Sequence, residues 1–235
     1  MTQDEAKRLV ARRAVVFVKD GMVVGLGTGT TATLFIRELA ARGLKIRCVA
    51  SSDASHALAE SLGMNVATLA ELPELDVYID GADEVCVPAG AGLGAGVGAG
   101  LNLIKGGGGA LLREKIVASA AKSFIVVADS TKLVEVLGKF PLPVEVVKMA
   151  LPLVGPRLAA LGLNPKLRQA KSGAGPYLTD EGNYILDCAC GRIDDPQKTA
   201  AAIRAIVGVV EHGLFLGMAT LALVAGENGV SEVRP

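Results

Sequence analysis

The stretch that decides the fold is MVVGLGTGTTATLFIRELAA, residues 22–41. Its apolar start, residues 22–26, predicts a strand, and residues 32–41 have the spacing of a helix. The turn between them, Gly27 to Thr31, combines glycines with hydroxyl side chains. Such a turn presents backbone N–H groups to an anion at the positive end of the helix dipole. The unit therefore predicts an α/β fold with a phosphate-binding turn, and the alternative is a tight turn with a threonine N-cap.

This turn differs from the common nucleotide-binding motifs. Its glycines are Gly25, Gly27 and Gly29, and residue 30 is threonine, so the dinucleotide pattern lacks its third glycine. The Lys-Ser/Thr pair of a P-loop is also absent from the turn. Hydroxyl and amide donors suit a single phosphate monoester better than a pyrophosphate. We predict that phosphate binds at Thr28, Gly29, Thr30 and Thr31.

Three further apolar runs each lead into a polar or glycine-rich loop. Residues 46–50 precede Ser51-Ser52-Asp53, residues 75–80 precede Gly81-Ala82-Asp83-Glu84, and residues 124–128 precede Asp129-Ser130-Thr131-Lys132. In a doubly wound, mostly parallel sheet, the carboxyl ends of the strands lie at one edge, where ligands bind. We therefore expect these loops to lie together.

The acidic loop at Asp80, Asp83 and Glu84 admits three interpretations. Crowded carboxylates raise one another's pKa, which suits proton transfer near neutral pH. Acidic clusters also hold magnesium through oxygen ligands. The third possibility is a solvated acidic turn.

A second glycine-rich stretch is LIKGGGGALLREKIVA, residues 103–118. Lys105 precedes four glycines, which open a segment with helical spacing, and Glu114 follows about one turn inside that segment. The glycine amides, the helix dipole and the lysine favour a charge-developing ligand, and Glu114 is a candidate base. The alternative is a glycine hinge before an ordinary helix.

The pattern changes after Lys139. A strand is predicted at 144–149, a helix at 151–161, a short extended segment at 167–170, a hairpin at 177–187, and a helix at 195–206 that Asp195-Pro196 begins. This order predicts a small α+β domain of the split βαβ kind at 140–208. Residues 209–215 and 219–225 are expected to return to the first sheet, so the α/β domain comprises 1–139 and 209–235.

Composition narrows the partners and the compartment. Net charge is zero, which argues against nucleic acid. The charged start, MTQDEAKR, lacks an apolar signal region, and the cysteines at 48, 86, 188 and 190 are predicted to be reduced thiols. Residues 85–104 carry no charge, but six of these twenty are glycines, so a loop is favoured over a membrane span. We expect a cytoplasmic location, or an organelle interior after processing.

The motifs in sequence resemble type A ribose-5-phosphate isomerase over nearly the whole chain. They are Gly25 to Ala32, Ser51 to Asp53, Asp80 to Glu84, Lys105 to Gly108, Arg113 to Lys115, Ala128 to Lys132, Gly138 to Glu145 and Gly213 to Phe215. The resemblance implies a pentose phosphate pathway enzyme that interconverts ribose 5-phosphate and ribulose 5-phosphate through an enediolate. It also implies that no cofactor or metal is needed, and that the protein is a homodimer or homotetramer.

The resemblance assigns roles to particular residues. Glu114 matches the base that moves a proton between C1 and C2, and Lys105 matches the lysine beside the developing enediolate oxygen. Asp80 and Asp83 match an acidic pair for ring opening and hydroxyl contacts. Lys7 matches a basic residue near the phosphate. The implied substrate-binding set is Thr28, Gly29, Thr30, Thr31, Gly81, Ala82, Gly106, Gly107, Gly108, Lys132 and Lys7.

The sequence departs from the family pattern at Thr30, where serine is usual, and between Asp83 and Lys105. That loop is about a dozen residues longer than usual, and loop-closure entropy grows slowly with length. Removing residues 88–99 should therefore leave folding and activity nearly intact. Two other function classes remain open. A non-catalytic sugar-phosphate sensor would give Glu114 no chemical task, and a nicotinamide-dependent oxidoreductase would lack its third glycine.

Overall fold

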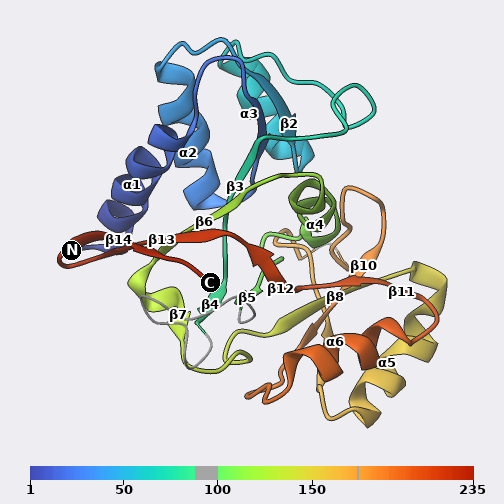
Figure 1. The fold of residues 1–235 in the computed structure, drawn as a ribbon. Helices are drawn as coiled ribbons and strands as arrows, with labels where there is room; N and C mark the ends of the chain where they lie inside the picture. Colours follow the sequence, from blue (N-terminus) through green and yellow to red (C-terminus); the bar gives the residue numbers. More distant parts are fainter. Residues whose placement is uncertain (88–99, 174) are drawn as a thin grey trace.

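The computed structural model describes residues 1–87, 100–173 and 175–235. Its centre is a six-stranded sheet in the order β14-β13-β6-β3-β1-β2 (Figure 1). Every neighbouring pair is parallel except β13 with β14. The strands are β1 (Val23–Leu26), β2 (Arg47–Ala50), β3 (Val77–Gly81), β6 (Phe124–Asp129), β13 (Leu221–Gly226) and β14 (Gly229–Val233). The four strands predicted from apolar runs lie in the parallel part of this sheet, as expected, and β13 is its fifth strand.

Helices cover both faces of the sheet. Successive residues of a strand point to opposite faces, so Ile79 of β3 packs in one core and Tyr78 in the other. The first core includes residues of α1 (Gln3–Ala14) and α2 (Thr30–Ala41), and the second includes residues of α4 (Leu111–Ser119). Figure 1 shows α1 and α2 on one side of the sheet and α4 on the other. The chain is thus doubly wound, as predicted.

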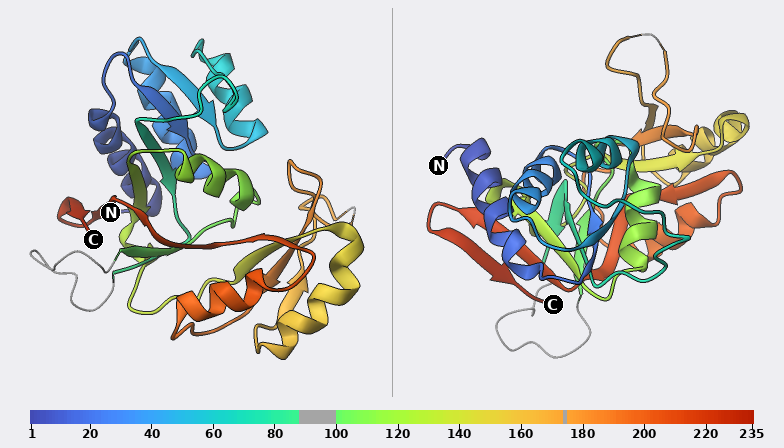
Figure 2. Two further views of the ribbon diagram at one scale, coloured as in Figure 1. Left: turned by 45° about the vertical axis from the view of Figure 1, so that its right-hand side comes forward. Right: turned by 90° about the horizontal axis from the view of Figure 1, so that it is seen from above.

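A separate four-stranded antiparallel sheet has the order β11-β8-β10-β9. Its strands are β8 (Leu142–Val146), β9 (Pro165–Leu167), β10 (Tyr184–Cys188) and β11 (Val209–His212), and its helices are α5 (Leu151–Ala160) and α6 (Pro196–Arg204). Asp195 caps α6 by accepting a hydrogen bond from the Lys198 N–H. The chain order β-α-β-β-α-β agrees with the predicted split βαβ arrangement. Figure 2 shows this unit, in yellow and orange, beside the central sheet.

Three local predictions in this region were wrong. The strand expected at 144–149 ends at Val146, and the extended segment expected at 167–170 lies at 165–167. The hairpin expected at 177–187 supplies one strand, β10, which pairs with β8 and β9 instead. Its first half forms a tight turn because the Thr179 N–H donates to the Asn183 carbonyl, and both side chains donate to Glu145.

A third sheet, in the order β12-β5-β4-β7, was not predicted. It comprises β4 (Glu84–Cys86), β5 (Leu101–Ile104), β7 (Leu133–Val134) and β12 (Leu214–Ala219). The expectation for the C-terminal strands was therefore right for β13 and wrong for β11 and β12. These two belong to the small sheet and the third sheet because β8 and β5 supply their partners.

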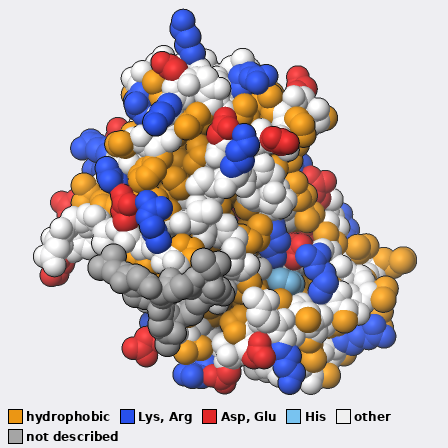
Figure 3. Space-filling model, viewed as in Figure 1, with side chains coloured by type: hydrophobic (Ala, Val, Ile, Leu, Met, Phe, Trp, Pro, Cys, Tyr) orange, Lys and Arg blue, Asp and Glu red, His pale blue; other side chains and the backbone are white. Residues whose placement is uncertain are grey.

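The helix that follows β2 is α3 (Asp53–Ser61), and short 3-10 turns occupy Val15–Phe17, Ser130–Lys132 and Lys148–Ala150. None of the helices in the described ranges has the length and hydropathy that a membrane crossing requires. Residues 88–99, whose removal was predicted to leave folding and activity nearly intact, lie outside the described residues. Basic and acidic side chains are interspersed over the face seen in Figure 3, in keeping with the zero net charge.

Candidate active site

A pocket of about 130 Å³ opens where the polar loops meet beyond the carboxyl ends of β1 and β3. Every predicted site residue lines it except Asp80 and Gly29, and Gln3 joins them. The lining residues are Gln3, Lys7, Thr28, Thr30, Thr31, Gly81, Ala82, Asp83, Lys105, Gly106, Gly107, Gly108, Glu114 and Lys132. The fold thus brings together two glycine-rich loops that are far apart in sequence.

Glu114 lies in the first turn of α4 and is only 3% exposed. Burial raises its pKa to about 8, against the opposing influence of the Lys105 charge. Its Oε2 atom makes no hydrogen bond within the described residues and lies 3.5 Å from Lys105 Nζ. Glu114 lines the pocket, has a raised pKa and has one oxygen that accepts no hydrogen bond within the described residues. Such a carboxylate is suited to take and return a proton.

Lys105 follows β5 and is almost fully buried. Its Nζ donates to Asp80 Oδ2 at 2.7 Å and to the Gly81 carbonyl. Burial opposes the charge, but the carboxylates of Asp80 and Glu114 outweigh it and raise the Lys105 pKa. The ammonium group therefore stays protonated and faces the pocket beside Glu114, where it can stabilise a developing oxyanion.

Asp80 lies behind the pocket. It is fully buried, and its carboxylate accepts hydrogen bonds from Lys105 Nζ, the Tyr78 hydroxyl and the Thr28 N–H, the last at 2.9 Å. A Cβ at Gly27 would lie 2.2 Å from Asp80 Oδ1, which explains the glycine there. The expectation that Asp80 faces the substrate beside Asp83 does not fit this geometry, because Asp80 is enclosed by these donors. In this position it orients Lys105.

Asp83 is the carboxylate of the acidic loop that reaches the pocket. Burial raises its pKa, and a hydrogen bond from the Gly107 N–H to Oδ2, 2.8 Å long, opposes that rise. A Cβ at Gly107 would lie 2.6 Å from Asp83 Oδ1 and 2.9 Å from the Phe140 ring. Asp83 and the glycine loop therefore pack directly together.

Glu84 is not part of an exposed acidic turn. It begins β4, is 2% exposed, and accepts hydrogen bonds from the backbone N–H groups of Gly138 and Phe140. The carboxylates of Asp80, Asp83 and Glu84, which are close in sequence, thus lie in three different environments. This separation removes the basis for the magnesium and solvated-turn interpretations of the loop.

The other end of the pocket is cationic and rich in donors. Thr30 and Thr31 form the first turn of α2, whose N-cap is Gly29 with a φ of 97°. Gly29 does not line the pocket, and its role is to let the chain turn into the helix. Lys7 of α1 and Lys132 complete this end. Two ammonium groups around a helix N-terminus match the requirements of a phosphate dianion.

Sequence reasoning missed Gln3, Tyr78 and Arg168. Gln3 lies on α1 one turn before Lys7, so the i, i+4 spacing could have indicated that both share a face. Tyr78 precedes Asp80 by two residues on β3, which puts both side chains on one face of the strand. Arg168 lies in the small domain, and no sequence signal places it against the glycine loop.

Comparison with known proteins identifies the family. The model for ribose 5-phosphate isomerase A (phosphoriboisomerase A) matches residues 47–229. A ribose-5-phosphate isomerase A of Caulobacter vibrioides is 47% identical over 241 residues, which cover all of both chains. One of Roseiflexus castenholzii is 51% identical over 234 residues, 97% of this chain and 94% of the relative.

Solved structures agree. The ribose 5-phosphate isomerase A of Methanocaldococcus jannaschii is 40% identical, covers all of both chains, and superimposes with a TM-score of 0.91. A D-ribose-5-phosphate isomerase solved in complex with phospho-erythronic acid is 36% identical over all of both chains, also with a TM-score of 0.91. The chain belongs to the ribose 5-phosphate isomerase A family.

Proposed function

We propose that this protein is an enzyme that interconverts D-ribose 5-phosphate and D-ribulose 5-phosphate through an enediolate. The observation that carries the proposal is Glu114, a buried carboxylate with a pKa of about 8 whose Oε2 accepts no hydrogen bond within the described residues and lies 3.5 Å from a buried lysine. Aldose–ketose isomerisation needs one base that moves a proton between adjacent carbons and a cation for the resulting oxyanion. Glu114 and Lys105 meet these two needs.

The substrate is held at its phosphate end by Thr28, Thr30, Thr31, Lys7 and Lys132. The anion-binding turn and the two lysines support this orientation. A fixed phosphate holds C1 and C2 against Glu114 and Lys105, so that the reacting carbons are already in position for proton transfer. The relative solved with phospho-erythronic acid bound a phosphorylated sugar acid, which has the same anionic end group.

The reaction begins with opening of the furanose ring. Asp83 is the group proposed to assist it, because it faces the pocket and has a raised pKa. Glu114 then removes the C2 proton, and Lys105 stabilises the negative charge that forms on O1. The O2 hydroxyl proton passes to O1, and Glu114 returns its proton to C1, which leaves the ketone at C2. Asp80 supports Lys105 from behind through the 2.7 Å hydrogen bond.

The resemblance further supports a place in the pentose phosphate pathway, a cytoplasmic location, a homodimer or homotetramer, and catalysis without a cofactor or metal. These remain proposals. The non-catalytic sensor is not retained as an alternative, because it gives the buried Glu114 carboxylate no chemical task.

The test is ribose 5-phosphate turnover by the purified protein, with and without a chelator, and by Glu114→Gln. We expect turnover that a chelator does not change and that Glu114→Gln loses. Full activity of a folded Glu114→Gln protein would remove the base assignment, and loss of activity on chelation would restore a metal requirement.

A further inference from the structure

Arg168 joins the small domain to the glycine loop of the pocket. It comes directly after β9, yet its Nη1 atom donates to the carbonyl oxygens of Gly106 and Gly107, at 3.0 and 3.2 Å. The Arg168 side chain is 13% exposed. One guanidinium nitrogen therefore binds two successive peptide carbonyls of the loop from the side of the small domain.

The guanidinium is itself fixed. Asp187 of β10 accepts from Arg168 Nε at 2.9 Å and from Nη2, which makes a bidentate pair. Tyr177 stacks nearby, with its ring centre 5.9 Å from the Arg168 Cζ, and its hydroxyl donates to the Gly108 carbonyl. A bidentate pair sets the plane of a guanidinium as well as its position. Nη1 is thereby aimed at the loop.

The Arg168 contact and a hydrogen bond from the Gly109 N–H to the Gly106 carbonyl, 3.0 Å long, together fix how the loop's peptides are turned. In a planar trans peptide, the C=O of one residue and the N–H of the next point in opposite directions. The Gly106 carbonyl faces Arg168, and the Gly107 N–H accordingly faces Asp83 Oδ2, 2.8 Å away. The Gly107 carbonyl also faces Arg168, so the Gly108 N–H points away from it. Gly108 lines the pocket, and its N–H makes no hydrogen bond within residues 1–87, 100–173 and 175–235.

We infer that Arg168 is a positioning residue that holds the 107–108 peptide with its N–H turned toward the substrate. The Gly108 N–H then donates to the oxygen that becomes negative in the enediolate, as a second donor beside Lys105. A peptide whose carbonyl is bound to a cation is also polarised, which strengthens its N–H as a donor. This inference rests on the proposed isomerase activity.

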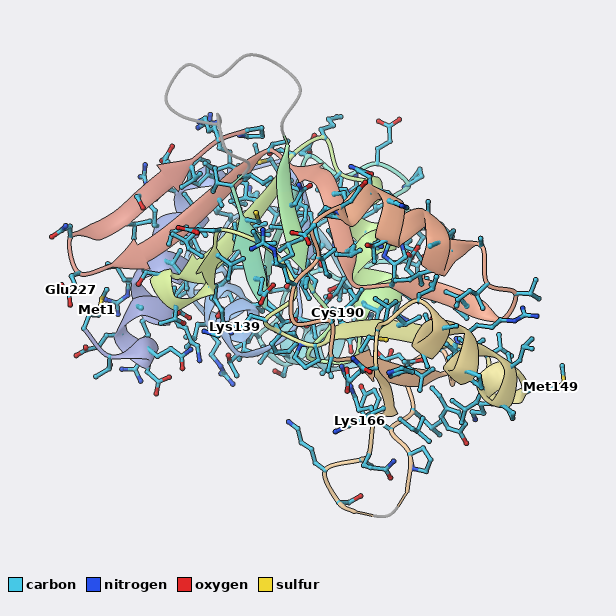
Figure 4. The ribbon with its side chains drawn as sticks, turned by 90° about the horizontal axis from the view of Figure 1, so that it is seen from below. Met1, Lys139, Met149, Lys166, Cys190 and Glu227 are labelled. Atoms are coloured by element: carbon cyan, nitrogen blue, oxygen red, sulfur yellow. The ribbon has the colours of Figure 1, made fainter. Side chains whose placement is uncertain are left out.

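The variants are Arg168→Ala and Arg168→Lys, with Lys166→Ala as the matched control. Lys166 is an exposed cation of β9, two residues before Arg168, and is labelled in Figure 4. Arg168→Ala is expected to lower kcat by about 10- to 100-fold, since losing a full oxyanion donor costs roughly 100- to 1,000-fold. KM should change less than about threefold, because Thr28 to Thr31 still hold the phosphate. Lys166→Ala should match the wild type.

Two further readouts separate positioning from damage. Added guanidinium ion should raise the kcat of Arg168→Ala severalfold and leave the wild type unchanged. Inorganic phosphate, as a competitive inhibitor, should bind Arg168→Ala and wild type equally. Arg168→Lys retains the aliphatic part of the side chain and the charge but not the planar guanidinium. It therefore tests the inference even if Arg168→Ala does not fold. It should show the same loss of kcat at unchanged KM.

The outcomes distinguish this inference from the proposed function. Wild-type kcat in a folded Arg168→Ala protein would overturn the inference and leave the isomerase activity standing. A loss that guanidinium does not restore, accompanied by weaker phosphate inhibition, would also overturn it, since the whole site would then have collapsed. No turnover by the wild-type protein would overturn both.

Discussion

Glu114 illustrates at the residue scale how reactivity is obtained at the expense of stability. Its pKa in the folded protein is about 8, above the ordinary value of 4.5, because burial disfavours the charged form. Between these two pH values the folded state binds a proton that the unfolded state releases. Folding stability therefore falls as pH rises through this window. The protein thus loses folding stability at neutral pH by burying Glu114, the carboxylate that we propose as the base.

Replacing Glu114 by Gln should therefore separate activity from stability. The amide keeps the side-chain volume and cannot accept the substrate proton, so kcat should fall by about 10²- to 10⁴-fold. The melting temperature should rise relative to the wild type, and the difference should grow up to about pH 8, because the amide has no charge to bury. Turnover and thermal unfolding measure the two effects. The matched control is Glu60→Gln, an exposed glutamate of α3, which should alter neither.

The same pKa predicts the pH dependence of the wild-type enzyme. The base acts in its deprotonated form, so kcat/KM should rise with pH and level off above the Glu114 pKa of about 8. Measuring kcat/KM from about pH 5 to about pH 10 gives the midpoint of the acid limb. A midpoint at the ordinary glutamate value of 4.5 would show that burial does not raise the pKa of the group that acts as the base.

How much of the site was predictable depends on whether its signal is local in sequence. Thr28 to Thr31, Lys105 and Glu114 lie in short glycine-rich motifs, so the sequence and the family resemblance point to them. Arg168 acts on Gly106, 62 residues away, and only the folded chain reveals that contact. The burial of Asp80 behind Lys105 is likewise a tertiary property that a one-dimensional motif does not contain.

At the scale of elements, the loop before α4 is shaped by what its glycines exclude. A Cβ on Gly107 would meet both Asp83 and the Phe140 ring at less than 3 Å. Gly106 and Gly109 have φ values of 100° and 96°, which L-amino acids rarely adopt. The four glycines therefore allow close packing against Asp83 as well as the approach of a ligand.

Gly107→Ala should consequently damage the site rather than the whole fold. Either Asp83 or the loop must move by several tenths of an ångström, and we expect kcat to fall at least about tenfold. Kinetics together with thermal unfolding measure the effect. Gly155→Ala in α5 is the control, because nothing lies within 4 Å of its Cβ. It should leave kcat unchanged and stabilise the protein by up to about 1 kcal/mol. Unchanged turnover in Gly107→Ala would contradict the packing argument.

The elements that sequence analysis predicted share one property, and those it missed lack it. β1, β3 and β6 are buried on both faces and appear as continuous apolar runs. The strands β4 and β7 have only three and two residues, too few for any periodicity. The pairing partners of β11 and β12 were also not predictable, because neither strand carries a sequence signal that selects one of the three sheets.

At the scale of the whole molecule, α4 is where the three sheets meet around Glu114. Arg113, on one side of Glu114, pairs with Asp53 of α3 and with Glu181 in the small domain, both at 2.6 Å. Lys115, on the other side, donates to Glu211 of β11 at 2.8 Å and to the carbonyls of His212 and Leu214. The Gly213 carbonyl between them accepts from the Lys105 N–H. Lys115 therefore ties the helix that carries Glu114 to the buried corner at residues 212–214, which also binds the Lys105 backbone.

The contacts of Arg113 and those of Lys115 should differ in their contribution to stability and in their response to salt. The Arg113 side chain is 29% exposed, so Arg113→Met should cost about 1 kcal/mol or less, an effect that shrinks at high salt. The Lys115 side chain is 14% exposed. Lys115→Met removes the donor that the Glu211 carboxylate and the carbonyls of His212 and Leu214 share. Arg204 still pairs with Glu211 at 2.6 Å, which limits the expected cost to about 2–3 kcal/mol, largely independent of salt.

Denaturant unfolding at low and high salt measures both costs, and Lys122→Met provides the control. Lys122 makes one exposed ion pair, with Asp76 at 3.1 Å, so its loss should be small and sensitive to salt. Lys115→Met should also lower kcat, because Lys115 would no longer fix the position of Glu114 relative to Lys105. Lys122→Met should leave kcat unchanged. If Lys115→Met cost no more than Arg113→Met, the buried corner at residues 212–214 would not be what fixes the base against the lysine.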